Sequence, residues 1–204
     1  AGQIVIATYP LIGNYGINVE DVESRRIQLS GYVVRRHEAY PSHYGDPGSV
    51  HDYLAAQGVP GISGVDTRAA TRRLRSQGVM MGCITSELSS EGALACLKDI
   101  PSYADLDYVG TVSTERSYLW HGEDGGTHQP EGESIVVVDC GLKYNILRKL
   151  WARGCAVTVV PAETTAQEIL ALKPFGVVLS PGPGDPASLK YAVNMVEGLI
   201  RQVP

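Results

Sequence analysis

The sequence predicts an α/β protein of two domains, the second built around a doubly wound parallel sheet. In residues 135–204, short β-branched runs alternate with amphipathic helical patterns, as expected of parallel strands joined by crossover helices. Residues before this region carry mixed strand and helix signals without a repeat. Between the two, residues 121–130 are polar and rich in glycine, which is typical of a linker or exposed loop. We therefore expect one domain in residues 1–133 and another in 134–204.

Composition narrows the class of protein. The 204 residues are 44% hydrophobic and 19% charged, as in ordinary globular proteins, and the formal net charge is −5. That charge does not favour nucleic acid as a partner, and no apolar run approaches the roughly 18 residues of a membrane span. The four cysteines form no CxxC or Cys/His pattern, so neither a zinc site nor a disulfide framework is expected. We expect a soluble cytoplasmic protein with buried free thiols, and no metal, nucleic acid or membrane partner.

The first domain is predicted from its helix signals and strand patterns. Ser49 and Asp66 are good N-cap residues, and Gly58 and Gly78 stand where the two helices should end. The expected strands cover residues 3–7, 26–35 and 79–85, and the expected helices cover residues 49–57, 67–77 and 91–98.

The second domain has the sharper pattern. Residues 135–138 are four consecutive β-branched residues, typical of a strand covered on both faces. A stripe of apolar residues follows at helical spacing, and Thr165 with Glu168 has the spacing of a capping box. Asp185 before Pro186 has the form of an N-cap. The expected strands cover residues 135–138, 156–160 and 176–180, and the expected helices cover residues 142–153, 165–172 and 185–199.

The loop at residues 180–186 is the clearest candidate site, because ligands of doubly wound sheets bind beyond the carboxyl ends of the strands. Gly182 and Gly184 lack a Cβ, so their backbone can approach a ligand closely, while the neighbouring prolines stiffen the loop. Pro181 and Pro183 have no N–H, which makes the Gly182 N–H a candidate donor to an oxyanion. A stiff turn without a ligand is the alternative. No Gly-Lys-Ser/Thr follows, so the loop is not a Walker phosphate loop.

Several segments together resemble a known family. Residues 139–148, 153–162 and 179–186 resemble class I glutamine amidotransferase domains. Residues 9–16 with 23–24, and residues 58–68 with 71–72, resemble the N-terminal domain peculiar to the small subunit of carbamoyl phosphate synthetase. The resemblance covers the whole chain.

This resemblance implies an N-terminal mixed β/α domain followed by the first half of an amidotransferase domain. The implied function is glutamine hydrolysis that supplies ammonia to a large synthetase subunit, which makes carbamoyl phosphate from bicarbonate and ATP for pyrimidine and arginine biosynthesis. L-glutamine and the large subunit are the implied partners, in a heterodimer. No cofactor is expected in this chain, whereas ATP and a divalent cation are expected on the large subunit.

The resemblance also assigns roles. Gly182 would stabilise the oxyanion and Gly184 would shape the glutamine pocket. The family's sequences begin before the equivalent of Ala1 and continue past that of Pro204, where the nucleophilic cysteine, its histidine and its glutamate are expected. No catalytic residue is therefore expected in these 204 residues, and the chain alone is expected to be inactive. Cys140 is a poor alternative nucleophile, because Val138 stands where a tight elbow needs a small residue.

Other interpretations remain open. The chain could be a non-catalytic docking module or a degenerate paralogue that binds the large subunit; a flavodoxin-like or receiver domain fits the second domain but not the first. Arg68, Arg72 and Arg75 share one helix face, which is either solvated or contacts an acidic surface of the large subunit. Lys143, Asn145 and Arg148 are either the solvated face of their helix or a partner contact.

Overall fold

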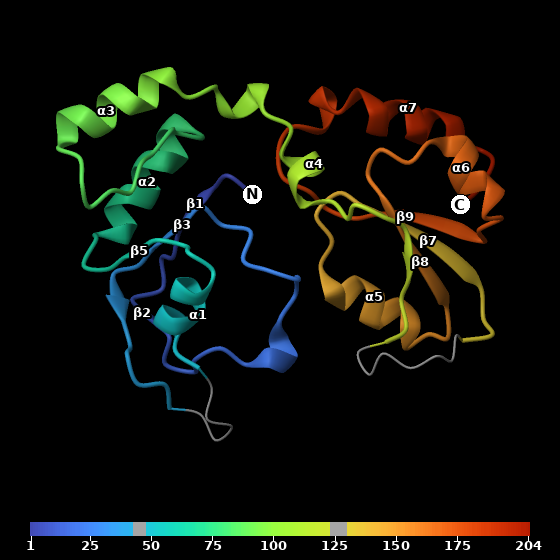
Figure 1. Ribbon diagram of the computed structural model, residues 1–204, viewed down its shortest axis with the longest axis horizontal. Helices are drawn as coiled ribbons and strands as arrows, with labels where there is room; N and C mark the ends of the chain where they lie inside the picture. The colour runs from blue at the N-terminus through green and yellow to red at the C-terminus, as the bar shows by residue number, and fades with distance from the viewer. Residues whose placement is uncertain (43–47, 123–129) are drawn as a thin grey trace. The chain divides into compact units, whose positions relative to one another are not determined.

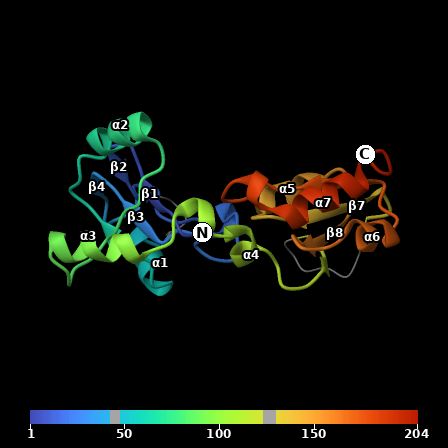
Figure 2. The same ribbon diagram turned by 90° about the horizontal axis from the view of Figure 1, so that it is seen from above.

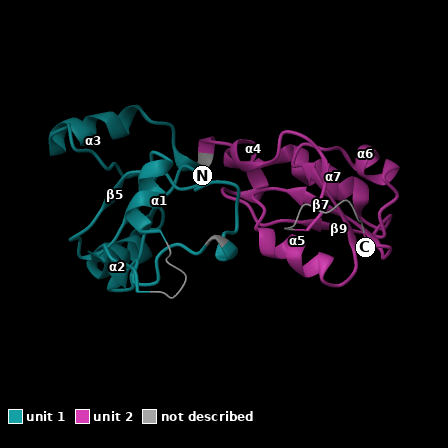
Figure 3. Cartoon of the chain, turned by 60° about the horizontal axis from the view of Figure 1, so that its bottom comes forward, with its two compact units in different colours: residues 1–103 teal, residues 104–204 magenta. Residues whose placement is uncertain are grey.

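The computed structural model describes residues 1–42, 48–122 and 130–204, which form two compact units, residues 1–103 and 104–204 (Figure 3). This division falls before the boundary predicted near Ser134. The reason is that two elements before Ser134 pack with the second unit. β6 (Tyr118–Leu119) pairs with a strand of that unit, and Val109 of α4 (Tyr108–Val112) lies in that unit's hydrophobic core. In the described part of the chain, no helix is long and apolar enough to cross a membrane.

The described residues of the first unit form two small parallel sheets and three helices (Figure 1). One sheet has the order β1-β3-β5 and the other pairs β2 with β4. The strands are β1 (Ile4–Ile6), β2 (Leu11–Ile12), β3 (Gly31–Val33), β4 (Arg36–His37) and β5 (Gly61–Ile62). The helices are α1 (Val50–Ala56), α2 (Thr67–Gln77) and α3 (Ser90–Asp99), with a 3₁₀ turn η1 (Val19–Asp21); η2 (Tyr103–Asp105) leads into the second unit.

The predicted helix caps of the first unit are confirmed. Ser49 Oγ accepts from the backbone N–H of Asp52 at 3.0 Å, and Asp66 Oδ1 accepts from that of Ala69 at 3.0 Å. Gly78 ends α2 with φ +81°.

Two predicted strands of this unit differ from the structure. The strand predicted at residues 26–35 is shorter, since only β3 pairs within that range, and the strand predicted at residues 79–85 is wrong, since these residues form no strand. Their side chains still contact the sheet: Ile84 lies against Gly31. A strand exists only through backbone pairing, which an apolar, β-prone sequence alone does not guarantee.

The second unit is a four-stranded sheet in the order β6-β8-β7-β9, and it confirms the predicted α/β class with a parallel sheet. β7 (Ser134–Asp139) is central and pairs in parallel with both β8 (Ala156–Pro161) and β9 (Gly176–Leu179). β6 adds an antiparallel edge next to β8.

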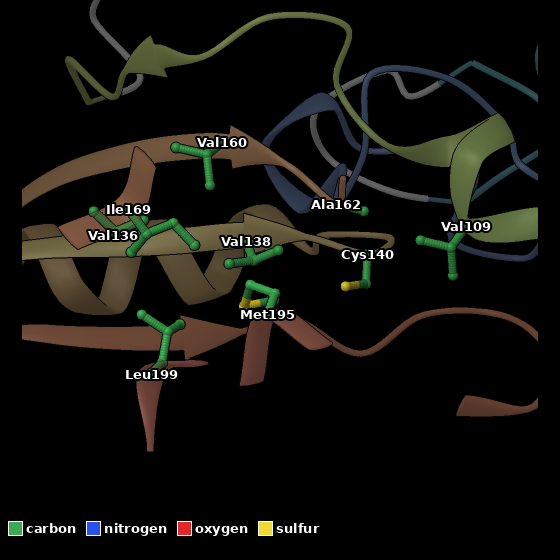
Figure 4. Close-up of a cluster of buried hydrophobic side chains, with 9 residues drawn as sticks. All are labelled: Val109, Val136, Val138, Cys140, Val160, Ala162, Ile169, Met195 and Leu199. Atoms are coloured by element: carbon green, nitrogen blue, oxygen red, sulfur yellow. The ribbon is translucent and has the colours of Figure 1, made fainter. Parts of the chain in front are cut away.

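Helices cover both faces of this sheet (Figure 1, and from above in Figure 2). Because successive side chains of a strand point to opposite faces, Val136 and Val138 pack with α6 (Ala166–Ala171) and α7 (Lys190–Leu199), as Figure 4 shows. Val137 faces the other way and packs with Leu147 of α5 (Tyr144–Trp151). All three valines are fully buried, as expected of a strand covered on both sides.

The capping signals of this unit are confirmed, with one change in a helix start. Thr165 and Glu168 form a capping box at the start of α6. Asp185 accepts from the backbone N–H of Ala187 at 2.9 Å, but it caps a 3₁₀ turn, η3 (Pro186–Ser188), rather than the predicted helix from residue 185. Helix α7 starts only at Lys190, because Leu189 adopts non-helical angles of φ −90° and ψ 71°.

Candidate functional site

The candidate site lies where two neighbouring parallel strands end. Val138 of β7 and Leu179 of β9 are the last paired residues in the register. Beyond them the backbone N–H of Ser180 donates to the Val138 carbonyl at 3.1 Å. The segments that follow β7 and β9 therefore leave the sheet side by side.

The Ser180 hydroxyl joins these two segments. Its oxygen accepts from the backbone N–H of Cys140 at 2.9 Å, and the hydroxyl donates to the carbonyl of Pro181 at 3.1 Å. Ser180 is only 7% exposed. The loop after β9 is therefore held to the end of β7 by both the backbone and the side chain of one buried residue.

Glycines allow the two segments to pack backbone against backbone. A Cβ on Gly182 would overlap the Cys140 carbonyl oxygen, and one on Gly141 would lie 3.2 Å from both Gly182 Cα and the Pro181 oxygen. Gly141 also has φ +134°, a backbone angle that residues with a side chain rarely adopt. Gly184 differs, because its φ is +93° but the space around a Cβ is open. Conformation favours glycine at 184, whereas close approach requires it at 182.

The backbone N–H of Gly182 is free to meet a ligand. Gly182 is exposed, and its N–H has no hydrogen-bond partner among the residues that the structure describes. The prolines on either side contribute no N–H of their own. The loop thus presents the Gly182 amide as a donor, held by packing before any ligand arrives, as an oxyanion site requires.

Asp139 fixes the other wall of the site. Its side chain is buried, with 8% of the residue exposed. Asp139 Oδ1 accepts from the backbone N–H groups of Gly141 at 3.0 Å and Leu142 at 2.8 Å. Oδ2 accepts from the backbone N–H of Thr114 at 2.9 Å. The next residue back, Ser113, accepts from the N–H of Ala162 at 2.9 Å. Residues 113–114 therefore tie the ends of β7 and β8 together.

Cys140 is unsuited to act as a nucleophile in this environment. The thiol is buried, and burial, with a smaller contribution from the Asp139 charge, raises its pKa. A nucleophilic cysteine needs the opposite, a cationic or basic neighbour that lowers the pKa. The structure agrees with the interpretation of Cys140 as a structural residue.

The remaining predicted residues lie elsewhere. Lys143 and Asn145 line an open depression of about 420 Å³ beside Val178 of β9, together with Lys149 and Arg153. Arg68, Arg72 and Arg75 are exposed on α2. Within residues 1–42, 48–122 and 130–204, no three His, Cys, Asp or Glu side chains gather as a metal site would need.

The first unit holds a second cavity, an open one of about 630 Å³. Tyr15, Glu23 and Ser24 line it, and all three belong to the segments that carry the resemblance in this unit.

Sequence reasoning missed Asp139, Ser180 and Ser113. Asp139 and Ser180 did leave a signal, because each is a polar residue placed directly after a run of apolar strand residues. In a parallel sheet such residues meet at one edge. Ser113 left none, since its role depends on a contact with Ala162 that is distant in the sequence.

Comparisons with known proteins found matches in both halves of the chain. Residues 1–84 match the family model described as the CPSase domain of the carbamoyl-phosphate synthase small chain, and residues 136–204 match that described as class-I glutamine amidotransferase. Among curated relatives, the carbamoyl phosphate synthase small chain of Syntrophotalea carbinolica is 44% identical over 100% of this chain and 56% of its own length. The small chain of Akkermansia muciniphila is 46% identical over 100% of this chain and 56% of its own length. That of Methanopyrus kandleri is 44% identical over 100% of this chain and 55% of its own length. The chain spans about half the length of the curated relatives it matches.

Proposed function

Because the chain belongs to the carbamoyl phosphate synthase small-chain family, we propose that it forms part of the glutamine-hydrolysing subunit of that enzyme. Residues 1–133 contain the N-terminal domain peculiar to this subunit and, at their end, α4 and β6, which pack with the second unit. Residues 134–204 form the first half of its amidotransferase domain. The subunit releases ammonia from the side chain of L-glutamine. A large synthetase subunit then uses it, with bicarbonate and ATP, to make carbamoyl phosphate in the cytoplasm for pyrimidine and arginine biosynthesis.

The observation that carries this proposal is the unpartnered Gly182 N–H at the carboxyl edge of the sheet. In amide hydrolysis through a cysteine nucleophile, attack on the carbonyl carbon turns the carbonyl oxygen into an oxyanion. A fixed N–H near that oxygen stabilises the transition state more than the substrate. Gly182 supplies this donor, and Gly184 shapes the pocket around the glutamine. No cofactor is needed here, because ATP and a divalent cation bind to the large subunit.

A hydrogen bond on the outer edge of β9 supports a position for the nucleophile. The backbone N–H of Val177 donates to the carbonyl of Pro204 at 2.9 Å. In a parallel ladder, residues after such a carbonyl run alongside the strand that donates to it. Residues that follow Pro204 in the family would then pass Val178 and Leu179 and reach the edge where Gly182 lies. We place the elbow with the nucleophilic cysteine there, with its histidine and glutamate further along.

The experiment compares glycine variants of the full-length small chain. The unmodified protein should release ammonia from glutamine, and with the large subunit and amide-¹⁵N-glutamine it should yield ¹⁵N-carbamoyl phosphate. Gly182→Ala keeps the N–H, but its Cβ would overlap the Cys140 carbonyl oxygen and move the donor away from the oxyanion. We expect kcat to fall by roughly 10²–10³, as when one oxyanion donor is lost. Gly132→Ala is the matched control, because its Cβ would also overlap a backbone carbonyl, that of Gly154, outside this loop. It should keep kcat.

Three outcomes would count against the proposal. An unmodified protein that binds the large subunit but hydrolyses no glutamine would be a docking module instead. Equal losses in the two variants would indicate general disruption, and ¹⁵N-free carbamoyl phosphate would exclude glutamine as the nitrogen source. Circular dichroism of both variants checks that each is folded.

A further inference from the structure

We propose that Ser180 is a positioning residue that aims the Gly182 N–H at the reacting carbonyl. The proposal rests on the proposed function for its catalytic meaning, and on the hydrogen bonds of this loop for its geometry. Ser180 itself does not touch the substrate. It acts through the peptide bond between Pro181 and Gly182.

The peptide plane transmits the effect. No peptide bond among the described residues is cis, so the C=O of Pro181 and the N–H of Gly182 point in opposite directions within one rigid plane. The Ser180 hydroxyl donates to the Pro181 oxygen at 3.1 Å. Holding this oxygen towards Ser180 directs the Gly182 N–H away from Ser180, into the open space in front of the loop.

The direction of the Ser180 hydrogen bond is fixed as well. A hydroxyl has one proton to donate. Its oxygen already accepts from the N–H of Cys140 at 2.9 Å, so the proton is left for the Pro181 oxygen. The Ser180 backbone is anchored by its N–H to the Val138 carbonyl at 3.1 Å, and the side chain is 7% exposed. A buried, anchored hydroxyl is a more rigid support than one on the surface.

Gly141 and Cys140 form the floor beneath the same peptide. The Pro181 oxygen and Gly182 Cα each lie 3.2 Å from the position of a Cβ on Gly141, and Gly182 packs on the Cys140 carbonyl. This floor limits how far the loop can sink but contains no donor for the Pro181 oxygen. Ser180 supplies the only hydrogen bond that the described residues give this oxygen. Without the hydroxyl, the peptide plane is free to rotate over the floor.

The first test measures the direction of the Gly182 N–H in this chain. Residual dipolar couplings report the orientation of an N–H vector and do not depend on activity. Ser180→Ala should change the Gly182 coupling relative to those of β7, whereas Ser180→Thr, which keeps the hydroxyl, should preserve it. Ser188→Ala removes an exposed hydroxyl just after the same loop and is the matched control. An unchanged Gly182 coupling in Ser180→Ala would overturn the inference, whatever the activity.

The second test measures glutamine hydrolysis by the same variants of the full-length small chain. Ser180→Ala should lower kcat about tenfold with little change in KM, less than the roughly 10²–10³ for a lost donor, because the N–H is misdirected rather than removed. Ser180→Thr should recover most of the loss, and Ser188→Ala should match the unmodified protein. A merely structural role would lower the melting temperature without this split between kcat and KM.

The outcomes separate the two proposals. If the unmodified protein hydrolyses glutamine and Ser180→Ala keeps its kcat, the positioning role is wrong and the proposed function stands. If the unmodified protein hydrolyses no glutamine, the proposed function fails, and the positioning role in that reaction fails with it, even where the coupling has changed.

Discussion

At the scale of single residues, buried polar groups shape the site more than the glycines that first indicate it. Asp139 accepts three backbone N–H groups from two different segments. Ser180 accepts from the N–H of Cys140 and donates to the Pro181 oxygen. Asp139 ends the central strand β7, and Ser180 directly follows the neighbouring strand β9. Accurate placement of a backbone donor follows from these side chains, since a buried polar group without a partner is costly.

The first prediction concerns Asp139. Asn presents one acceptor oxygen and an NH₂ group, so Asp139→Asn leaves at least the Thr114 N–H facing a donor. We expect a loss of about 2 kcal/mol in the free energy of unfolding, because an unsatisfied buried polar group costs roughly 1–3 kcal/mol. Urea denaturation measures it. Asp105→Asn, at an exposed aspartate of the same unit, is the control and should be neutral; equal stability of both variants would contradict the role of Asp139.

The second prediction concerns the thiols. The expectation of buried thiols is wrong for Cys83 and Cys96, which are exposed, and is confirmed for Cys140. Burial and the Asp139 charge raise the pKa of Cys140, so less of it is thiolate at a given pH than for an ordinary cysteine. At about pH 8, near the ordinary cysteine pKa, iodoacetamide should alkylate the exposed Cys83 and Cys96 and spare Cys140. Mass spectrometry of the peptides measures this, and urea-unfolded protein is the control. Alkylation of native Cys140 as fast as Cys83 would show a reactive thiol there.

At the scale of elements, one hydrogen bond joins α7 to α4. The Tyr191 hydroxyl donates to Asp107 Oδ2 at 3.0 Å, and Asp107 Oδ1 accepts from the N–H of Gly110 as the N-cap of α4. Burial, then this hydrogen bond and the Asp107 charge, raise the pKa of Tyr191. The folded protein therefore favours the neutral phenol. Its contribution is present at neutral pH and is lost as pH rises above about 10, the ordinary pKa of tyrosine.

Tyr191→Phe should therefore lower the free energy of unfolding by about 1 kcal/mol at pH 7, the net value of a typical hydrogen bond. The difference from the unmodified protein should shrink above about pH 10, where the unfolded tyrosine ionises. Thermal and urea unfolding across this pH range measure it. Tyr9→Phe, at a tyrosine that is 67% exposed, is the control. A difference that grew with pH would contradict the direction of the pKa change.

Elements supported by local signals could be predicted from the sequence. The central strand was predicted from its β-branched run, and α1, α2 and α6 from caps that the structure contains. The two-residue strands could not be predicted, because β6 exists only through its pairing with β8. The strand predicted at residues 79–85 failed for the same reason, since pairing depends on partners outside the segment.

The candidate site shows the same limit. The sequence indicated Gly182 and Gly184 because glycine and proline report on the local backbone. It did not indicate that Ser180 and Cys140 meet, because they follow two different strands and lie 40 residues apart in the sequence. The roles of both glycines stay predictions until a ligand is tested.

At the scale of the whole molecule, the proposed function requires a second subunit that uses the released ammonia. Helix α2 offers a candidate contact, since Arg68, Arg72, Arg73 and Arg75 are all exposed and the helix contains no acidic residue. No ion pair to these arginines is found among the described residues. An acidic surface on the large subunit would complement this charge.

The full-length small chain with Arg72→Glu should therefore bind the large subunit about tenfold more weakly at low salt, with a smaller difference at high salt, because salt screens exposed charges. Surface plasmon resonance at two ionic strengths measures it. Arg36→Glu makes the same charge reversal at another exposed arginine and should bind normally. Equal binding by both variants would remove α2 from the interface.

The most direct measurement of the central claim is a crystal structure of the full-length small chain with a glutamine-derived acyl group on its nucleophile. The account predicts that the acyl carbonyl oxygen lies about 2.7–3.1 Å from the Gly182 nitrogen, the distance range of an oxyanion donor. A carbonyl oxygen bound by other donors, with the Gly182 N–H turned towards Cys140 or facing only solvent, would contradict it.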